Sequence, residues 1–200
     1  MPTPFYIVFE GPIAAGKTTH AQLLADKVSA KLLLEDFPGN ESLADFYGDK
    51  YRWALPMQLW FLVSRHAQLS TIVTPVSEAV IVDYSCLKNQ MFAELLLKDR
   101  ELRLYNQLSS IFKANVAHPD LLVYLDASNE ILLDRIHTRN RPYEKTIDAN
   151  YLDSLRDAYE KELDSSQFDV VRYDTSNLDL MSEADVDALQ RIILNAVAKN

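Results

Sequence analysis

The sequence predicts an α/β fold in which a five-stranded parallel sheet carries helices on both of its faces. Five short apolar runs, rich in β-branched and aromatic residues, alternate with longer stretches of helical periodicity. The runs are apolar throughout, which is typical of strands buried on both faces. The chain has 200 residues and contains no Gly/Ser-rich linker or internal repeat. We therefore expect residues 1–200 to form one domain.

The individual elements follow from this pattern. The predicted strands cover residues 5–10, 30–36, 79–83, 120–126 and 168–174. Helices are expected to begin near Lys17, Tyr51, Leu87, Leu102, Asn129, Ala149 and Ser182, with Ser128 and Ser182 as N-cap residues. The segment 37–50 contains turn residues as well as aromatic ones, so we interpret it as a structured connection.

Composition and charge exclude several functional classes. The formal net charge of −9 argues against broad contact with nucleic acid or with an anionic membrane. Cys86 is the only cysteine, so neither an internal disulfide nor a cysteine-based zinc site is expected. The chain starts without a signal-peptide pattern and has no apolar run near the ~20 residues of a membrane span. We expect a cytoplasmic protein that binds anionic ligands through a local cluster of cations.

One glycine-containing motif carries most of the chemistry. The chain has only four glycines, and Gly11 and Gly16 stand five residues apart, directly before Lys17 and Thr18. This matches G-x-x-x-x-G-K-[ST], in which backbone N–H groups surround a phosphate chain, the lysine reaches the outer phosphates and the hydroxyl holds magnesium. The motif lies between a predicted strand and a predicted helix, as this loop requires. The residues expected to hold ATP are Gly11, Ile13, Ala14, Ala15, Gly16, Lys17, Thr18 and Thr19.

The acceptor of the phosphoryl group is not named by this loop. The sequence contains no Asn-Lys-x-Asp segment for guanine and no Asp-x-x-Gly switch after the third predicted strand. A kinase of a small molecule is therefore favoured over a GTPase.

Four further stretches, taken in order with the phosphate loop, resemble the deoxynucleoside kinase family. They are Glu35, "FYGDKYRWALPMQLWFLVSR" (46–65), "VDYS" (82–85) and "RIHTRNRPYE" (135–144). The resemblance runs from about Tyr6 to Leu163 and is closest to short bacterial-type purine deoxynucleoside kinases, including those fused to a pterin pyrophosphokinase. It implies a P-loop kinase that phosphorylates the 5′-hydroxyl of a deoxynucleoside with ATP and Mg²⁺, with deoxyadenosine as the favoured substrate.

The resemblance also implies catalytic roles. Glu35 ends the second predicted strand, at the sheet edge where α/β proteins bind ligands, and would be the general base; Asp36 is the alternative. Arg135, Arg139 and Arg141 would belong to a lid over residues 135–146 that closes on the ATP phosphates. A solvated basic helix end is the alternative interpretation of these arginines.

Other residues would select the nucleoside. By resemblance, Tyr47 and Glu144 would bind the sugar 3′-hydroxyl, although a core tyrosine and an exposed lid carboxylate are also compatible with the sequence. Gln58 and Arg65 stand about two helical turns apart and can face one pocket, where the Gln58 amide would match an adenine edge. The aromatic side chains at Trp53, Phe61 and Phe92 can wall this pocket, but we favour a core role for them.

One departure from the family pattern concerns the segment after the third strand. The family commonly has an acid-Arg-Ser triplet there, whereas this chain has Asp83-Tyr84-Ser85. Asp83 can still serve magnesium together with Thr18, but Tyr84 cannot supply the missing positive charge. Our hypothesis is that Lys88, one turn into the following helix, restores that charge; a solvated helix lysine is the alternative.

The sequence is also compatible with two alternative functions and with a homodimer. A thymidylate-kinase-like enzyme also begins "EG…GKTT", although its Asp-Arg-Tyr-type segment is missing here. A catalytically silent ATP-binding protein is the second rival, because of the missing arginine. Family members commonly form homodimers, and the helix-rich segments 51–72 and 86–117 contain enough apolar residues for that.

Overall fold

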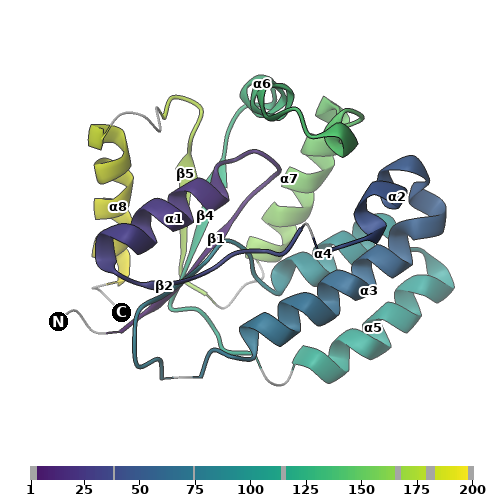
Figure 1. Cartoon of the computed structure of the whole chain (residues 1–200), viewed down its shortest axis with the longest axis horizontal. Helices are drawn as coiled ribbons and strands as arrows, with labels where there is room; N and C mark the ends of the chain where they lie inside the picture. Colours follow the sequence, from purple (N-terminus) through teal and green to yellow (C-terminus); the bar gives the residue numbers. More distant parts are fainter. Residues whose placement is uncertain are drawn as a thin grey trace.

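Five parallel strands form one sheet in the order β2-β3-β1-β4-β5. Helices surround this sheet (Figure 1). The computed structural model describes residues 4–37, 39–73, 75–113, 116–164, 168–178 and 183–197. The strands are β1 (Tyr6–Glu10), β2 (Lys31–Leu33), β3 (Val80–Val82), β4 (Leu121–Asp126) and β5 (Val170–Asp174). Because β1 lies between β3 and β4, the chain order reverses at its carboxyl end, and α/β sheets bind ligands at such a point.

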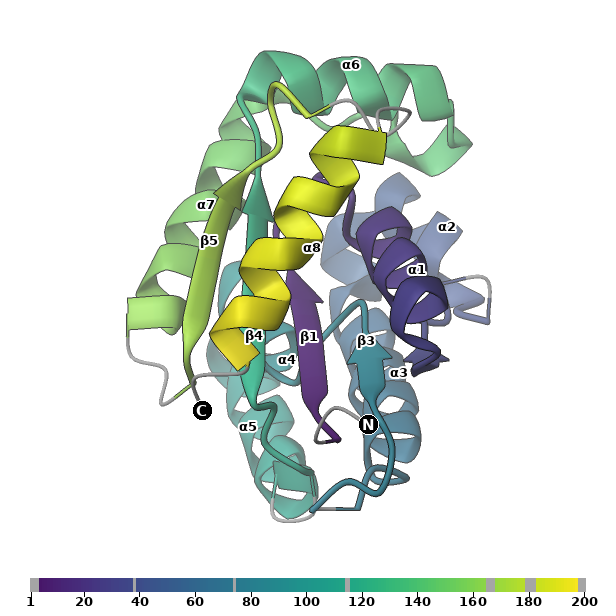
Figure 2. The same ribbon diagram turned by 90° about the vertical axis from the view of Figure 1, so that its left-hand side faces the viewer.

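Helices cover both faces of this sheet (Figure 2). On one face, α1 packs on β1 and β3, and α8 packs on β4. On the other face, α4 contacts α3, α5 and α7. Above the carboxyl ends of the strands lies α6, and α2 contacts α3 and the short 3₁₀ turn η1. The bounds are α1 (Lys17–Val28), α2 (Ser42–Gly48), α3 (Lys50–Leu69), α4 (Leu87–Leu96), α5 (Asp99–Lys113), α6 (Asn129–Arg139), η1 (Pro142–Glu144), α7 (Ala149–Asp164) and α8 (Glu183–Val197).

Alternation along β1 divides the core into two halves. Ile7 and Phe9 pack with Leu24 of α1 on one face of the sheet. Tyr6 and Val8 belong to the other face, because successive side chains of a strand point to opposite sides. By the same parity, Glu10 points to the face that carries α4 and α7. All five residues of β1 are buried, as the continuous apolar run predicted.

The predicted α/β class and parallel sheet are confirmed. Four helices begin at the predicted residues, and the Ser128 hydroxyl accepts from Ile131 N at 3.4 Å as the N-cap of α6. The predicted helix start at Ser182 lies outside the described residues.

The structure adds one helix to the prediction and moves the start of another. The segment 37–50 is not only a connection, because it contains α2, whose buried Leu43 and Phe46 are three residues apart on one helix face. The turn residues around this short helix obscured its period. The helix predicted to begin near Leu102 begins at Asp99, since acidic residues in a first turn favour a helix start through the helix dipole.

The described helices include none with both the length and the apolar character needed to cross a membrane.

Candidate active site

The phosphate loop joins β1 to α1 and needs glycine at both of its predicted positions. Gly11 has φ 143°, and a Cβ there would lie 1.9 Å from the Leu125 carbonyl oxygen. Gly16 has φ 96° and stands directly before α1. Only glycine adopts such φ values without strain. The two glycines therefore allow the loop to pass close to β4 and then enter the helix.

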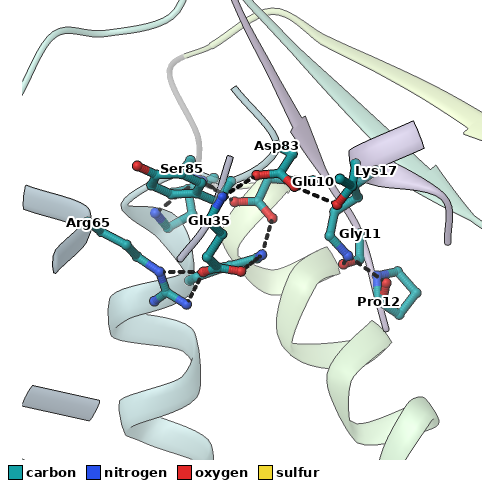
Figure 3. A network of polar contacts seen from close by, with 12 residues as sticks. Glu10, Gly11, Pro12, Lys17, Glu35, Arg65, Asp83 and Ser85 are labelled. Carbon is teal, nitrogen blue, oxygen red and sulfur yellow. Dashed lines mark hydrogen bonds and ion pairs between the residues drawn. The ribbon is translucent and has the colours of Figure 1, made fainter. Parts of the chain in front are cut away.

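Lys17 begins α1 and turns back over the loop. Its Nζ donates to the carbonyl oxygens of Gly11 and Pro12, both at 2.8 Å (Figure 3). Burial and the nearby Lys88 lower the pKa of Lys17 to about 7, although Glu10 and other carboxylates oppose this shift. An anion near the ammonium would raise this pKa again.

Glu35 lies just beyond β2 and is 7% exposed. Its Oε1 accepts from Arg65 Nε at 2.7 Å, and its Oε2 accepts from Lys88 Nζ at 3.2 Å. Burial alone would raise the pKa of this carboxyl, but the two cations outweigh burial and lower the pKa to about 2. Glu35 is therefore ionised at neutral pH, and its two oxygens are oriented by α3 and α4.

Asp83 follows β3 and connects the phosphate loop to Glu35. Its Oδ2 accepts from the Thr18 hydroxyl at 2.5 Å, and its Oδ1 accepts from Glu35 N at 2.7 Å. The described residues contain no group of three or more His, Cys, Asp and Glu side chains placed to hold a metal ion. Mg²⁺ commonly takes one or two protein oxygens together with substrate phosphates, and the paired oxygens of Thr18 and Asp83 fit that pattern.

The lid arginines have different partners. Arg135 donates to the carbonyl oxygen of Thr175 at 2.7 Å and to that of Ala14 at 3.5 Å, which ties α6 to the phosphate loop. Arg139 Nη2 lies 2.7 Å from Glu144 Oε2, and Arg141 Nη1 lies 3.5 Å from Glu144 Oε1. Glu144, expected to be a sugar ligand, is thus ion-paired within the lid and 4% exposed.

A cavity of about 580 Å³ opens at the carboxyl ends of the strands. It is lined by every predicted site residue: Gly11, Ile13, Ala14, Ala15, Gly16, Lys17, Thr18, Thr19, Glu35, Tyr47, Gln58, Arg65, Asp83, Lys88, Arg135, Arg139, Arg141 and Glu144. Phe61 and Phe92 also line it, whereas Trp53 does not. Their predicted roles in binding and catalysis stay predictions, but the fold brings all of them to one chamber.

Gln58 has the free polar group that a nucleobase site needs. Its side chain is 2% exposed, and its Oε1 has no hydrogen-bond partner within the part of the chain that the structure describes. A buried acceptor without a partner costs about 1–3 kcal/mol, so a ligand donor at this atom would be favourable. The amide lies on α3, two turns before Arg65.

Several polar residues of the site were not predicted from the sequence. Glu10 is fully buried at the end of β1, Asn89 accepts from Arg65 at 2.7 Å, and Thr175 anchors Arg135. The acid in "FEGP" directly precedes the phosphate loop, which was the available signal for Glu10. Tyr84, where the resemblance implied an arginine, is fully buried and donates its hydroxyl to Gln68.

Comparisons with known proteins agree with this geometry. The family model described as deoxynucleoside kinase matches residues 7–198. Deoxyguanosine kinase of Bacillus subtilis (strain 168) is 36% identical over 163 residues, which cover 80% of this chain and 79% of that protein. Deoxyadenosine kinase of Dictyostelium discoideum is 33% identical over 173 residues, covering 84% and 69% of the two chains. The fold matches deoxyadenosine kinase from M. mycoides with bound dATP at a TM-score of 0.80 and 21% identity, over 94% of this chain and 98% of that one.

Proposed function

This chain belongs to the deoxynucleoside kinase family, and from that premise we propose that it transfers the γ-phosphoryl group of ATP to the 5′-hydroxyl of a purine deoxynucleoside. The observation that carries the proposal is the chain of contacts from the phosphate loop to a buried carboxylate. Thr18 bonds Asp83, and Asp83 bonds the backbone of Glu35, within one cavity.

Each residue would act on a defined part of the reaction. The phosphate loop and Lys17 would hold the phosphate chain of ATP, and Thr18 with Asp83 would hold Mg²⁺. Bound magnesium would neutralise charge on the phosphates. The lid cations Arg139 and Arg141 would exchange part of their pairing with Glu144 for the transferring group.

The low pKa of Glu35 constrains its role as base. A carboxyl with a pKa of about 2 is a weak base toward an unreacted alcohol. It can still accept a hydrogen bond from the 5′-hydroxyl and fix its direction. The hydroxyl becomes acidic as its bond to phosphorus forms, so Glu35 would accept the proton late in the transfer. This fits a loose transition state, in which positioning matters more than proton abstraction.

Lys88 would supply the positive charge that Tyr84 lacks. Its side chain is 4% exposed, lines the cavity and lies 3.2 Å from Glu35 Oε2. These contacts favour the charge-replacement hypothesis over a solvated helix lysine.

The purine of the substrate is the second part of the proposal. An amide at Gln58 can pair with adenine or with guanine, because both purine edges offer an adjacent donor and acceptor. We favour deoxyadenosine on the family resemblance, and the Bacillus subtilis relative makes deoxyguanosine its direct competitor.

A panel assay tests the proposal. Purified protein is given ATP, Mg²⁺ and each of the four deoxynucleosides, with thymidine monophosphate as a further acceptor, and ADP release and the nucleotide product are measured. We expect the highest kcat/KM with a purine deoxynucleoside. Phosphorylation of thymidine monophosphate alone would support the thymidylate-kinase-like alternative, and ATP binding without any product would support a silent protein.

The proposed homodimer is tested separately by light scattering coupled to size-exclusion chromatography. Among the described residues of α3 and α5, three large aliphatic side chains are exposed, namely Val63, Leu104 and Ile111. They support an association through these helices, and a molecular mass near that of one chain would contradict it.

A further inference from the structure

We infer that Glu10 is a positioning residue for phosphoryl transfer, which acts by holding Lys88 beside Glu35 from beneath the active-site cavity. The inference rests on the proposed kinase reaction and adds a residue to it. Glu10 is fully buried, and it is absent from the described residues that line the cavity. It therefore cannot touch the substrate directly and must act through its neighbours.

Glu10 is an ionisable residue at a costly position. It ends the central strand β1 and points to the face that carries α4 and α7. Burying a carboxylate costs several kcal/mol unless other groups compensate its charge and fill its hydrogen-bonding positions. Glu10 is compensated in this way. Its Oε1 accepts from the backbone N and the hydroxyl of Ser85, both at 2.6 Å (Figure 3). Its Oε2 accepts from the Tyr159 hydroxyl at 3.0 Å.

The first route from Glu10 to Lys88 is electrostatic. Lys88 Nζ lies 3.9 Å from Glu10 Oε2 and 3.2 Å from Glu35 Oε2. The ammonium therefore sits between two carboxylates, one below the cavity and one in its wall. Glu35 is also paired with Arg65, so Lys88 shares this carboxylate with a second cation. Glu10 therefore provides an attraction that holds Lys88 independently of Glu35.

The second route passes through the backbone. The Ser85 hydroxyl donates to Glu10 and accepts from Leu87 N at 3.1 Å, and Leu87 is the first residue of α4. Glu10 thereby fixes the start of the helix whose first turn carries Lys88. A small shift of this turn would move the ammonium relative to the reacting atoms, and misplacement by about 1 Å can cost about a hundredfold in rate.

The charges around the floor of the cavity are consistent with this role. Arg65 and Lys88 both lie beside Glu35, so two buried cations share this one carboxylate of the cavity wall. Glu10 adds a carboxylate close to Lys88 without occupying space in the cavity. The two buried cations can then stay close together at the wall of the cavity.

Glu10→Gln tests the inference, because the amide has nearly the same shape and can still accept from Ser85 N. We expect kcat with a purine deoxynucleoside to fall by about tenfold or more, while KM for ATP and for the nucleoside changes by less than about threefold. In the Lys88→Met background, the same substitution should lower kcat by less than about twofold, since the ammonium that Glu10 positions is then absent.

Asp120→Asn is the matched control. Asp120 bonds Tyr6 N at 2.7 Å at the opposite end of β1, far from the carboxyl ends of the strands, so losing this carboxylate should leave kcat unchanged. If Glu10 has a purely structural role, Glu10→Gln will lower the unfolding midpoint, and its loss of kcat will multiply with the loss caused by Lys88→Met in the double variant. That outcome overturns the inference, as does wild-type kcat in Glu10→Gln.

A second variant and the activity of the wild-type protein complete the test. If Glu10→Gln does not fold, Ser85→Ala removes the hydroxyl bridge and keeps the carboxylate; the same cycle with Lys88→Met applies, with a several-fold loss of kcat expected only when Lys88 is present. If the wild-type protein phosphorylates no deoxynucleoside, the proposed function fails. If the wild type is active and Glu10→Gln equals it, only the positioning role fails.

Discussion

Lys88→Met removes the charge that this structure places beside the proposed base and keeps nearly the same side-chain volume. The lost contacts are 3.2 Å to Glu35 Oε2 and 3.9 Å to Glu10 Oε2. At an effective dielectric constant of about 20, each attraction is about 4–5 kcal/mol. The methionine also avoids the several kcal/mol needed to desolvate a buried ammonium. Removing one partner of a buried ion pair typically destabilises a protein by about 3–5 kcal/mol, and we expect a loss of that order in the free energy of unfolding.

The effect on turnover should be larger than the effect on substrate binding. Removing one preorganised group that stabilises transition-state charge typically costs about 10²–10³ in kcat. We expect about a hundredfold loss of kcat, with KM for the deoxynucleoside changed by less than about threefold.

The assay measures ADP release at saturating ATP, Mg²⁺ and the preferred deoxynucleoside, with urea unfolding measured on the same preparations. Lys98→Met is the matched control, because Lys98 is an exposed lysine between α4 and α5. A Lys88→Met enzyme that folds normally and turns over at the wild-type rate would remove Lys88 from the mechanism.

Three further predictions concern Glu35, Lys17 and Gln58. The folded-state pKa of Glu35 is lowered to about 2 from 4.5, so its stabilisation of about 3 kcal/mol is present above pH 4.5 and is lost as pH falls toward 2. Urea unfolding of the wild type and Glu35→Gln should therefore converge across that window, and a constant difference would contradict the assignment. Since burial and Lys88 lower the pKa of Lys17 to about 7, ATP binding should add a proton to Lys17 and weaken as pH rises from about 7 to 9. Calorimetry in buffers of different ionisation enthalpy measures this uptake, which Lys17→Met should abolish. Gln58→Leu should raise KM for the purine deoxynucleoside about tenfold through loss of base hydrogen bonds, and an unchanged KM would exclude Gln58 from base recognition.

Much of the fold could be predicted because its signals are local. The apolar runs, the start of α6 at Ser128 and the glycine positions of the phosphate loop each depend on a few neighbouring residues. The short helix α2 escaped prediction, because turn residues surround only two buried apolar positions, Leu43 and Phe46.

The candidate site was predicted as a set of residues but not as a network. Arg65 illustrates the difference: helical spacing placed it in the pocket with Gln58, whereas the structure pairs it with Glu35 and Asn89. Glu144 likewise was expected to face a sugar, and its carboxylate is paired with Arg139.

The sequence by itself determined that this chain builds a parallel sheet with a phosphate loop after its first strand, because strand periodicity and loop geometry are encoded within about ten consecutive residues. Only the tertiary structure decided which charges meet. Glu10 contacts Ser85 and Tyr159, which are 75 and 149 positions away in the chain. Such pairs are set by strand order and helix packing, which bring the ends of β1 and β3 next to α7, and no local pattern specifies them.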